Sequence, residues 1–300
     1  MELSVVVSTL NDREQLLSCL DALSERTPQS TEVIVVNGPS SDGTTGVVRE
    51  RSDVDVLVEI SERNPNVSRN AGLGVATGDA VAFLDGEYTV EPSWYESIER
   101  SLGAESDVVT GPITGEKPLG RDPHATRTVA GRRVQPFDAG NVAFDRTVLS
   151  ALDGFDEYLE TGGARDCAHR VAGLGFDTEW TAEMAARSEF GADGGTPEPD
   201  WGEAYRSLSY RLAKNYGVRP TLLARTGLRA LRDGISGARR VVAGDVTPTD
   251  WFSDGLAVVR NAVGGLHDGL RARYTDRSAR RNPNGLSVRH DRAVRMYDRR

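Results

Sequence analysis

The sequence predicts an α/β protein with a doubly wound, mostly parallel sheet and a mainly helical C-terminal extension. In the first hundred residues, short apolar runs rich in β-branched residues alternate with helical patterns, and this order is typical of parallel sheets. From about residue 203 the pattern becomes helical. The 300 residues are enough for one large domain, or for a domain of about 200 residues plus an extension.

Each expected element follows from such a run or from helical periodicity. Strands are expected over 5–9, 33–36, 54–60 and 80–84. A helix carrying Leu16, Leu20 and Leu23 follows the first strand, and a short helix carrying Val47 and Val48 follows the second strand. Helices over 65–76 and 92–102 follow the third and fourth strands. Near the C-terminus, spacings of three and four predict a helix through Phe252, Leu256, Val259, Val263, Leu266 and Leu270, after an earlier helix marked by Leu228, Leu231 and Ile235.

Charge divides the chain into an acidic body and a basic C-terminal third. Residues 1–200 carry 16 Lys and Arg against 36 Asp and Glu, a balance of −20, whereas residues 201–300 carry 20 against 9, a balance of +11. We expect an α/β domain over 1–200, a helical extension over 201–270 and a basic, mobile tail over 271–300. The tail is expected to be mobile because it holds ten Arg and few large apolar residues.

Composition excludes several classes of protein. The net charge of −9 argues against a nucleic-acid binder, and two cysteines without a CxxC motif provide neither a disulfide framework nor a zinc site. The first residues resemble a strand and not a signal peptide, and no apolar stretch approaches about 18 residues, so we expect a cytoplasmic protein, soluble or peripheral. Lys occurs only at Lys117 and Lys214, which suits the salt-rich cytoplasm of a halophile, although a GC-rich genome also favours Arg.

Polar residues follow the ends of the predicted strands, where a doubly wound sheet binds its ligands. They are Asn11, Asp12, Asn37, Asp42, Asp85 and Glu87. No GxGxxG follows the first strand and no GxxxxGK[ST] occurs, so dinucleotide and P-loop sites are disfavoured. In an extended Asp-x-Glu, both carboxylates can lie on one side, where they suit Mg²⁺ or Mn²⁺ completed by substrate phosphates. Asp-Gly-Glu alone also fits a tight acidic turn.

Several segments in order resemble the family 2 glycosyltransferases and their GT-A fold. They are Ser4–Asn11, Val35–Thr44, Ser68–Gly72, Phe83–Glu87, Gly140–Arg146 and Gly154–Glu157. The match covers roughly residues 3–185. The resemblance implies an enzyme that moves a sugar from a nucleotide diphosphate donor to a glycan or lipid-linked acceptor, with inversion at the anomeric carbon, in cell-surface glycan assembly.

The resemblance also implies site residues. Thr9, Asn11, Asn37, Asp42, Arg69 and Asp85 would bind the nucleotide-sugar, and Asp85 and Glu87 would bind Mg²⁺ or Mn²⁺. Two positions depart from the family pattern. Asn37 stands where Asp is usual and brings no charge, and Glu87 replaces the last Asp of the metal motif but keeps the ligand type. Asp42 also fits a turn-forming role.

A third departure concerns the catalytic base. Where the family commonly has Glu-Asp, this chain has Gly163 and Ala164. An inverting transfer needs a base within reach of the acceptor hydroxyl, and Asp166 is the first candidate and Glu160 the second. Asp166 equally fits stabilisation of a helix N-terminus, worth about 0.3–1 kcal/mol. A phosphate acceptor would need no strong base.

Two questions stay open at the level of sequence. The basic helices and Arg tail within 203–300 either dock on an anionic membrane or pack on the acidic body or a second subunit. The chain as a whole also fits a nucleotidyltransferase-like enzyme, although Leu10–Arg13 lacks the Gly-rich, Lys-bearing loop such enzymes need. A non-catalytic nucleotide-sugar-binding module is the remaining alternative, because the Glu-Asp pair is missing.

Overall fold

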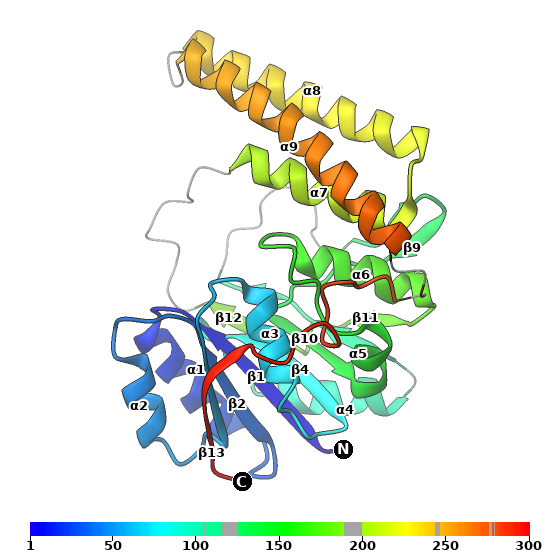
Figure 1. The fold of residues 1–300 in the computed structure, drawn as a ribbon. Coiled ribbons are helices and arrows are strands. Elements are labelled where there is room, and N and C mark those ends of the chain that lie inside the picture. The colour runs from blue at the N-terminus through cyan, green and yellow to red at the C-terminus, as the bar shows by residue number, and fades with distance from the viewer. Residues whose placement is uncertain (105, 116–124, 189–199, 244–246, 276–277, 279) are drawn as a thin grey trace. The chain divides into compact units, whose positions relative to one another are not determined.

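The computed structural model describes residues 1–104, 106–115, 125–188, 200–243, 247–275, 278 and 280–300 (Figure 1). The chain divides into two compact units. Unit 1 comprises Met1–Arg127, Arg133–Gly195 and Asn284–Arg300, and unit 2 comprises Thr128–Arg132 and Thr196–Pro283. The predicted boundaries at 200 and 270 therefore differ from the observed division, because the last seventeen or so residues return to unit 1.

Unit 1 is built around an eight-stranded sheet with the order β11-β6-β10-β4-β1-β2-β3-β13. Its strands are β1 (Leu3–Thr9), β2 (Glu32–Asn37), β3 (Val56–Ile60), β4 (Ala80–Asp85), β6 (Val108–Thr110), β10 (Asn141–Asp145), β11 (Thr178–Trp180) and β13 (Ala293–Asp298). The first four strands run parallel, whereas β10 is antiparallel to both β4 and β6. The predicted doubly wound, mostly parallel sheet is confirmed.

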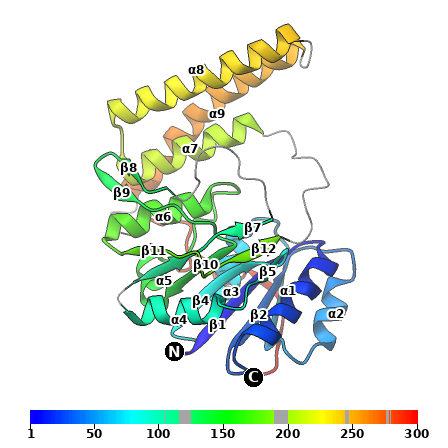
Figure 2. The same ribbon diagram turned by 180° about the vertical axis from the view of Figure 1, so that it is seen from behind.

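The helices of unit 1 cover both faces of this sheet (Figure 2). One face is covered by α1 (Arg13–Arg26), α2 (Thr44–Glu50) and α4 (Trp94–Ala104). The other is covered by α3 (Pro65–Leu73), α5 (Arg146–Leu152) and α6 (Gly163–Leu174). Alternation along the strands supplies both cores: in β1, Val6 faces α3, while Val5 and Val7 face α1. Smaller sheets are formed by β5 (Tyr88–Val90), β12 (Ala186–Ser188) and β7 (Ile113–Thr114), and by β8 (Arg127–Val129) and β9 (Arg132–Val134).

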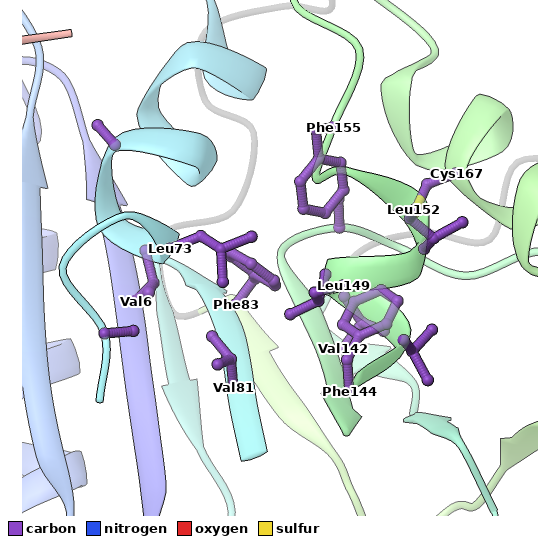
Figure 3. Packing of buried hydrophobic residues seen from close by; sticks show 14 of the residues in the cluster. Val6, Leu73, Val81, Phe83, Val142, Phe144, Leu149, Leu152, Phe155 and Cys167 are labelled. Atoms are coloured by element: carbon purple, nitrogen blue, oxygen red, sulfur yellow. The ribbon is translucent and has the colours of Figure 1, made fainter. Parts of the chain in front are cut away.

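An aromatic cluster fixes the loop that follows α5 against the sheet (Figure 3). Phe83 on β4, Phe144 on β10 and Phe155 in the loop are fully buried and meet edge to face, with ring centroids 5.0–6.3 Å apart. Such aromatic pairs contribute about 0.5–1.5 kcal/mol beyond the burial of their area. The loop carrying Gly154–Glu157 is therefore held firmly beside the carboxyl end of β4.

The C-terminal segment differs from the predicted mobile tail. Strand β13 pairs antiparallel with β3 and closes that edge of the sheet, and Leu286 packs against the hydrophobic core. Arg300 Nη1 donates to the Glu32 carboxylate at 2.7 Å. Backbone pairing and ion pairs made by its Arg residues hold this segment where large apolar side chains are scarce, and backbone pairing leaves no pattern in the local composition.

Unit 2 is mainly helical, as the sequence predicts for the extension. It contains α7 (Trp201–Tyr216), α8 (Pro220–Ala243) and α9 (Pro248–Thr275). Helix α9 packs against α7 through glycines: a Cβ on Gly265 would lie 2.1 Å from the Arg206 carbonyl oxygen, and one on Gly269 would lie 2.3 Å from that of Tyr210. Among the residues that the structure describes, no helix combines the length and the apolar character needed to cross a bilayer.

Candidate active site

Three predicted site residues lie at the ends of adjacent strands. Thr9 on β1 pairs with Asn37 on β2, and Asp85 on β4 pairs with Ser8. Asn37 pairs in turn with Glu59 on β3. Carboxyl ends of parallel strands meet at one edge of a sheet, so these residues lie at the ends of four adjacent strands, with Thr9, Asn37 and Glu59 in one register and Asp85 beside Ser8. This is the edge at which the sequence places the ligand.

The loops after β1 and β2 are bonded to each other. Asn11 adopts a left-handed backbone conformation (φ 58°), and its Oδ1 accepts from the Ser41 amide at 2.8 Å. Asp42 accepts from the amides of Arg13 and Thr44 at 3.0 and 3.1 Å. Burial acts to raise the pKa of Asp42, but these hydrogen bonds and one from the Thr44 hydroxyl hold this pKa below its ordinary value. Asn11 and Asp42 thus fix the shape of the two loops, and contact with a nucleotide stays a prediction for both.

Asn37 is fixed by hydrogen bonds on both ends of its amide. Ser40 Oγ donates to its Oδ1 at 2.7 Å, and its Nδ2 donates to Thr45 Oγ1 at 3.0 Å. The Thr45 hydroxyl donates to Glu59 Oε1 at 2.8 Å. This chain of bonds runs from the loop after β2 to the end of β3. The amide at position 37 therefore serves to order the loop that crosses the strand ends.

Arg69 and Asp85 form an ion pair at the centre of the edge. Arg69 lies on α3, its side chain is 9% exposed, and its Nη2 lies 3.2 Å from Asp85 Oδ1. A Cβ on Gly140 would lie 2.5 Å from Asp85 Oδ2, so only glycine leaves that carboxylate its place. The Gly140 amide donates to Asp138 Oδ1 at 2.7 Å. Burial raises the pKa of Asp85, the charge of Arg69 opposes this, and the Asp138 carboxylate adds to it.

Several buried polar atoms at this edge have no hydrogen-bond partner in the described part of the chain. They include Thr9 Oγ1, Arg69 Nε and Glu59 Oε2. A buried donor or acceptor left unpaired costs about 1–3 kcal/mol. Such atoms are expected where a polar ligand completes the site, and a hydroxyl, a guanidinium and a carboxylate together suit a nucleotide.

Asp85 and Glu87 have the right chemistry for a divalent cation. Asp85 is half-buried at the strand end, and Glu87 is exposed two residues later, with Gly86 between them. Within the described ranges, no group of three or more His, Cys, Asp or Glu side chains is placed to hold a metal. Mg²⁺ commonly takes only one or two protein carboxylates and completes its shell with water and substrate phosphates. The pair fits such a site and does not fit a cation held by protein alone.

Helix α3 also holds the loop between α5 and α6. Asn70 is fully buried, accepts from the Phe155 amide at 2.8 Å and donates to the Phe155 carbonyl at 2.9 Å. Its Nδ2 also donates to Glu157 Oε1 at 2.7 Å, and the same carboxylate is paired with Arg292 and Arg289 from the C-terminal segment. Arg69 and this loop are thus positioned by one helix.

The two candidate bases occupy contrasting environments. Asp166 is fully buried in the first turn of α6, and its Oδ2 accepts from Arg170 Nε at 2.8 Å. Arg170 also donates to the carbonyls of Leu152 and Gly154. This arrangement favours a structural role for Asp166, because an acceptor hydroxyl cannot reach a carboxylate with no exposed surface. Glu160 is exposed in the loop before α6.

The missing Glu-Asp pair has a steric counterpart. A Cβ on Gly163 would lie 2.3 Å from Asn66 Oδ1 and 2.4 Å from its Nδ2. Asn66 is 1% exposed, its Nδ2 donates to the Leu159 carbonyl at 2.5 Å, and its Oδ1 accepts from Arg69 Nη1 at 3.3 Å. Asn66 therefore fills the space that a side chain at position 163 would occupy, and no carboxylate fits there.

Sequence reasoning did not identify Asp138, Glu59 or Glu157 as residues of this region. Asp138 comes before β10, and only the pairing of β10 with β4 brings it beside Asp85. Glu59 alternates with apolar residues in β3, and its position near the end of that strand is the signal that could have marked it as a site residue. Glu157 lies in a segment that was recognised as a motif but was assigned no contact.

Comparison with known proteins supports the resemblance. Residues 4–152 match the family model described as glycosyl transferase family 2. The chain is 32% identical over 124 residues to glycosyltransferase AglE of Haloferax volcanii, which covers 39% of this chain and 41% of AglE. It is 30% identical over 109 residues to the putative glycosyltransferase EpsH of Bacillus subtilis, which covers 35% of this chain and 32% of EpsH. The chain thus matches less than half the length of these relatives.

Two solved structures share the fold. A mannosyltransferase, PcManGT from Pyrobaculum calidifontis, in complex with GDP-Man and Mn²⁺, superposes with a TM-score of 0.59 and 18% identity, covering 92% of this chain and 88% of that one. TarS 1–349 of S. aureus, in complex with UDP-GlcNAc, gives a TM-score of 0.61 and 16% identity, covering 92% and 91%. The sheet order, the polar residues at the strand ends and these matches agree: residues 4–152 belong to glycosyltransferase family 2, and the chain has a GT-A fold.

Proposed function

We propose that the protein transfers a sugar from a nucleotide diphosphate donor to an acceptor, with inversion at the anomeric carbon. The observation that carries this proposal is the register that brings Thr9, Asn37 and Asp85 to one edge of the sheet. Relatives are named glycosyltransferases, and two proteins of the same fold bind GDP-Man and UDP-GlcNAc. Which sugar this chain takes depends on the shape of its own pocket.

In this proposal the donor lies across the row of strand ends. The Thr9 hydroxyl and the Glu59 carboxylate, each with an atom left unpaired in the described part of the chain, take part in binding the nucleoside. Asn11, Asn37 and Asp42 hold the loops around it. Arg69 turns its guanidinium from Asp85 toward the diphosphate. A guanidinium is suited to this because it bonds phosphate oxygens with several donors at once.

Asp85 and Glu87 would hold Mg²⁺ or Mn²⁺ together with the donor phosphates. A bound cation supplies charge neutralisation on the leaving nucleoside diphosphate. The protein's own part is to fix Asp85, which β4 and the close approach of Gly140 accomplish. Removal of Arg69 from the ion pair with Asp85 frees that carboxylate for the cation. The two events are therefore expected to be coupled.

Acceptor activation is the step for which this chain departs from the family pattern. Asp166 is buried against Arg170, and Asn66 fills the space at Gly163. These contacts favour the hypothesis that the acceptor oxygen is already anionic, as in a phosphate on a lipid-linked acceptor. Such an oxygen needs no strong base. Glu160 is the exposed carboxylate available if the acceptor is a glycan hydroxyl. An acceptor in cell-surface glycan assembly fits both cases.

The test begins with a thermal-shift screen of nucleotide-sugars with Mn²⁺, since a ligand that binds the folded state raises the Tm. The donor found is then incubated with the enzyme and the released product is identified. Release of nucleoside diphosphate supports the proposal. A nucleotidyltransferase would instead release pyrophosphate from a nucleoside triphosphate and a sugar phosphate supplied in a parallel reaction, and binding without any release indicates a non-catalytic module.

A further inference from the structure

The two long helices of unit 2 carry large apolar side chains on their outward sides. These residues, here called the apolar face, are Leu223, Leu228, Leu231, Ile235 and Val242 on α8 and Phe252, Leu256, Val259 and Val263 on α9. They are 45–90% exposed. Most of them recur at spacings of three, four and seven residues, so they form a stripe along each helix. Soluble proteins usually expose such residues singly.

The inward sides of the same helices are built from small residues. On α8, a Cβ on Gly237 would lie 2.8 Å from the Trp251 ring, and the Trp251 indole donates to the Gly234 carbonyl at 3.0 Å. On α9, Gly265 and Gly269 lie against the backbone of α7. The closest packing of these helices is therefore made through glycine and one tryptophan, while Leu222 of α8 is buried and Leu266 and Leu270 of α9 are half-buried. The residues of the apolar face are left outside this packing, whereas the apolar stripe of a helix usually faces the core.

The charge on α8 is strongly positive. Among its residues are Arg225, Arg229, Arg232, Arg239 and Arg240, against a single acid, Asp233. Asp233 accepts a hydrogen bond from the Tyr205 hydroxyl at 2.7 Å and lies 3.7 Å from Arg229. A helix with an apolar stripe bordered by Arg is typical of segments that lie in the interface of an anionic bilayer.

We propose that the apolar face docks the protein on a bilayer that contains anionic lipids. The aliphatic and aromatic side chains enter among the headgroups, and the Arg of α8 contact lipid phosphates. A second copy of this chain is a poorer occupant, because a two-fold contact would bring α8 with its surplus of Arg against itself. Docking does not depend on sugar transfer, and it would suit a lipid-linked acceptor if the proposed function holds.

Apolar and ionic contributions respond differently to salt. The Debye length is about 3 Å at 1 M salt, so attraction between Arg and lipid phosphate is largely screened there. Burial of the apolar face is not screened in this way. Binding to anionic vesicles should therefore weaken as salt rises from about 0.1 M to about 1 M and still persist at the higher value.

The test is flotation of the full-length protein with vesicles of phosphatidylglycerol and phosphatidylcholine in equal parts. The variant Leu231→Ser/Phe252→Ser changes side chains that are 60% and 69% exposed, so its fold should be intact. Its partition coefficient is expected to fall about a hundredfold, from the loss of two buried apolar side chains. The matched control is Val294→Ser/Met296→Ser on β13, where the side chains are 62% and 52% exposed, and its partition should equal that of the wild type.

A second variant separates charge from burial. Arg232→Gln/Arg239→Gln should bind the anionic vesicles roughly 25-fold more weakly at low salt, since each basic residue contributes about fivefold near such a surface. It should bind pure phosphatidylcholine vesicles as the wild type does. Asp85→Ala should float like the wild type even if it releases no nucleoside diphosphate, which keeps this test independent of the proposed function. Failure of the wild type to float, or a dimer that the Leu231→Ser/Phe252→Ser change dissociates, would overturn the proposal.

Discussion

Replacing Asp166 with asparagine separates a structural role from a catalytic one. Asp166 has no exposed surface, and the side chain of its partner Arg170 is 2% exposed. Removing one member of a buried ion pair leaves an uncompensated charge and costs about 3–5 kcal/mol. Asparagine keeps an oxygen for Arg170 Nε, and Asp156 lies near enough to offset part of the charge, so we expect about 3 kcal/mol.

The assay compares thermal unfolding with turnover. For a unit of this size, about 3 kcal/mol lowers the Tm by roughly 6–12 °C. Measured well below that Tm, kcat should stay within about threefold of the wild type, because no acceptor touches the buried carboxylate. The control is Asp291→Asn, at a side chain that is 87% exposed, and it should change neither quantity. A normal Tm combined with a loss of kcat of about a hundredfold or more would refute this reasoning and make Asp166 the base.

Further expected outcomes concern the donor site and the C-terminal segment. Thr9→Val should weaken nucleoside diphosphate binding about three- to tenfold in calorimetry without lowering the Tm, because the Thr9 hydroxyl has no hydrogen-bond partner among the residues that the structure describes. Unchanged affinity would remove Thr9 from the site. Arg292→Ala should cost about 2 kcal/mol and speed amide exchange in β13, because Glu157 loses a buried partner but keeps Arg289; equal exchange rates would contradict this. Burial acts to raise the pKa of Glu32, but hydrogen bonds, one of them from Arg300, hold this pKa below its ordinary value of 4.5. Ionised Glu32 therefore stabilises the fold above that pH, and this stabilisation is lost as the pH falls through the lower pKa of the folded state. The Tm deficit of Glu32→Gln should consequently shrink between pH 7 and pH 3. A constant deficit would show that titration of Glu32 does not contribute to the pH dependence of stability.

The central strands and the row of strand-end residues were predictable because their signal is local. Buried parallel strands need continuous β-branched runs, such as Val33–Val36, and their carboxyl ends meet whatever the packing. Thr9, Asn37 and Asp85 therefore lie at the carboxyl ends of adjacent strands, at the edge where the sequence places them. Asp138 was not found, because only the antiparallel pairing of β10 brings it beside Asp85.

Two C-terminal features depended on tertiary contacts that the local sequence does not reveal. Strand β13 is mostly exposed and carries few apolar residues, and its pairing with β3 is made by backbone atoms that any sequence possesses. For α9, the spacing predicted a helix and an apolar stripe, but Gly265 and Gly269 decide which side packs. The stripe through Phe252 and Leu256 is consequently exposed within unit 2.

The central claim is that Asp85 and Glu87 hold a divalent cation that assists departure of a nucleoside diphosphate. The most direct measurement is release of nucleoside diphosphate from the donor identified by thermal shift, with Mn²⁺ and with chelator, for the wild type and for Asp85→Ala. We expect release by the wild type that chelator abolishes, and a loss of about a hundredfold or more in Asp85→Ala with its Tm retained. Release that is equal in Asp85→Ala, or that continues undiminished in chelator, would contradict it.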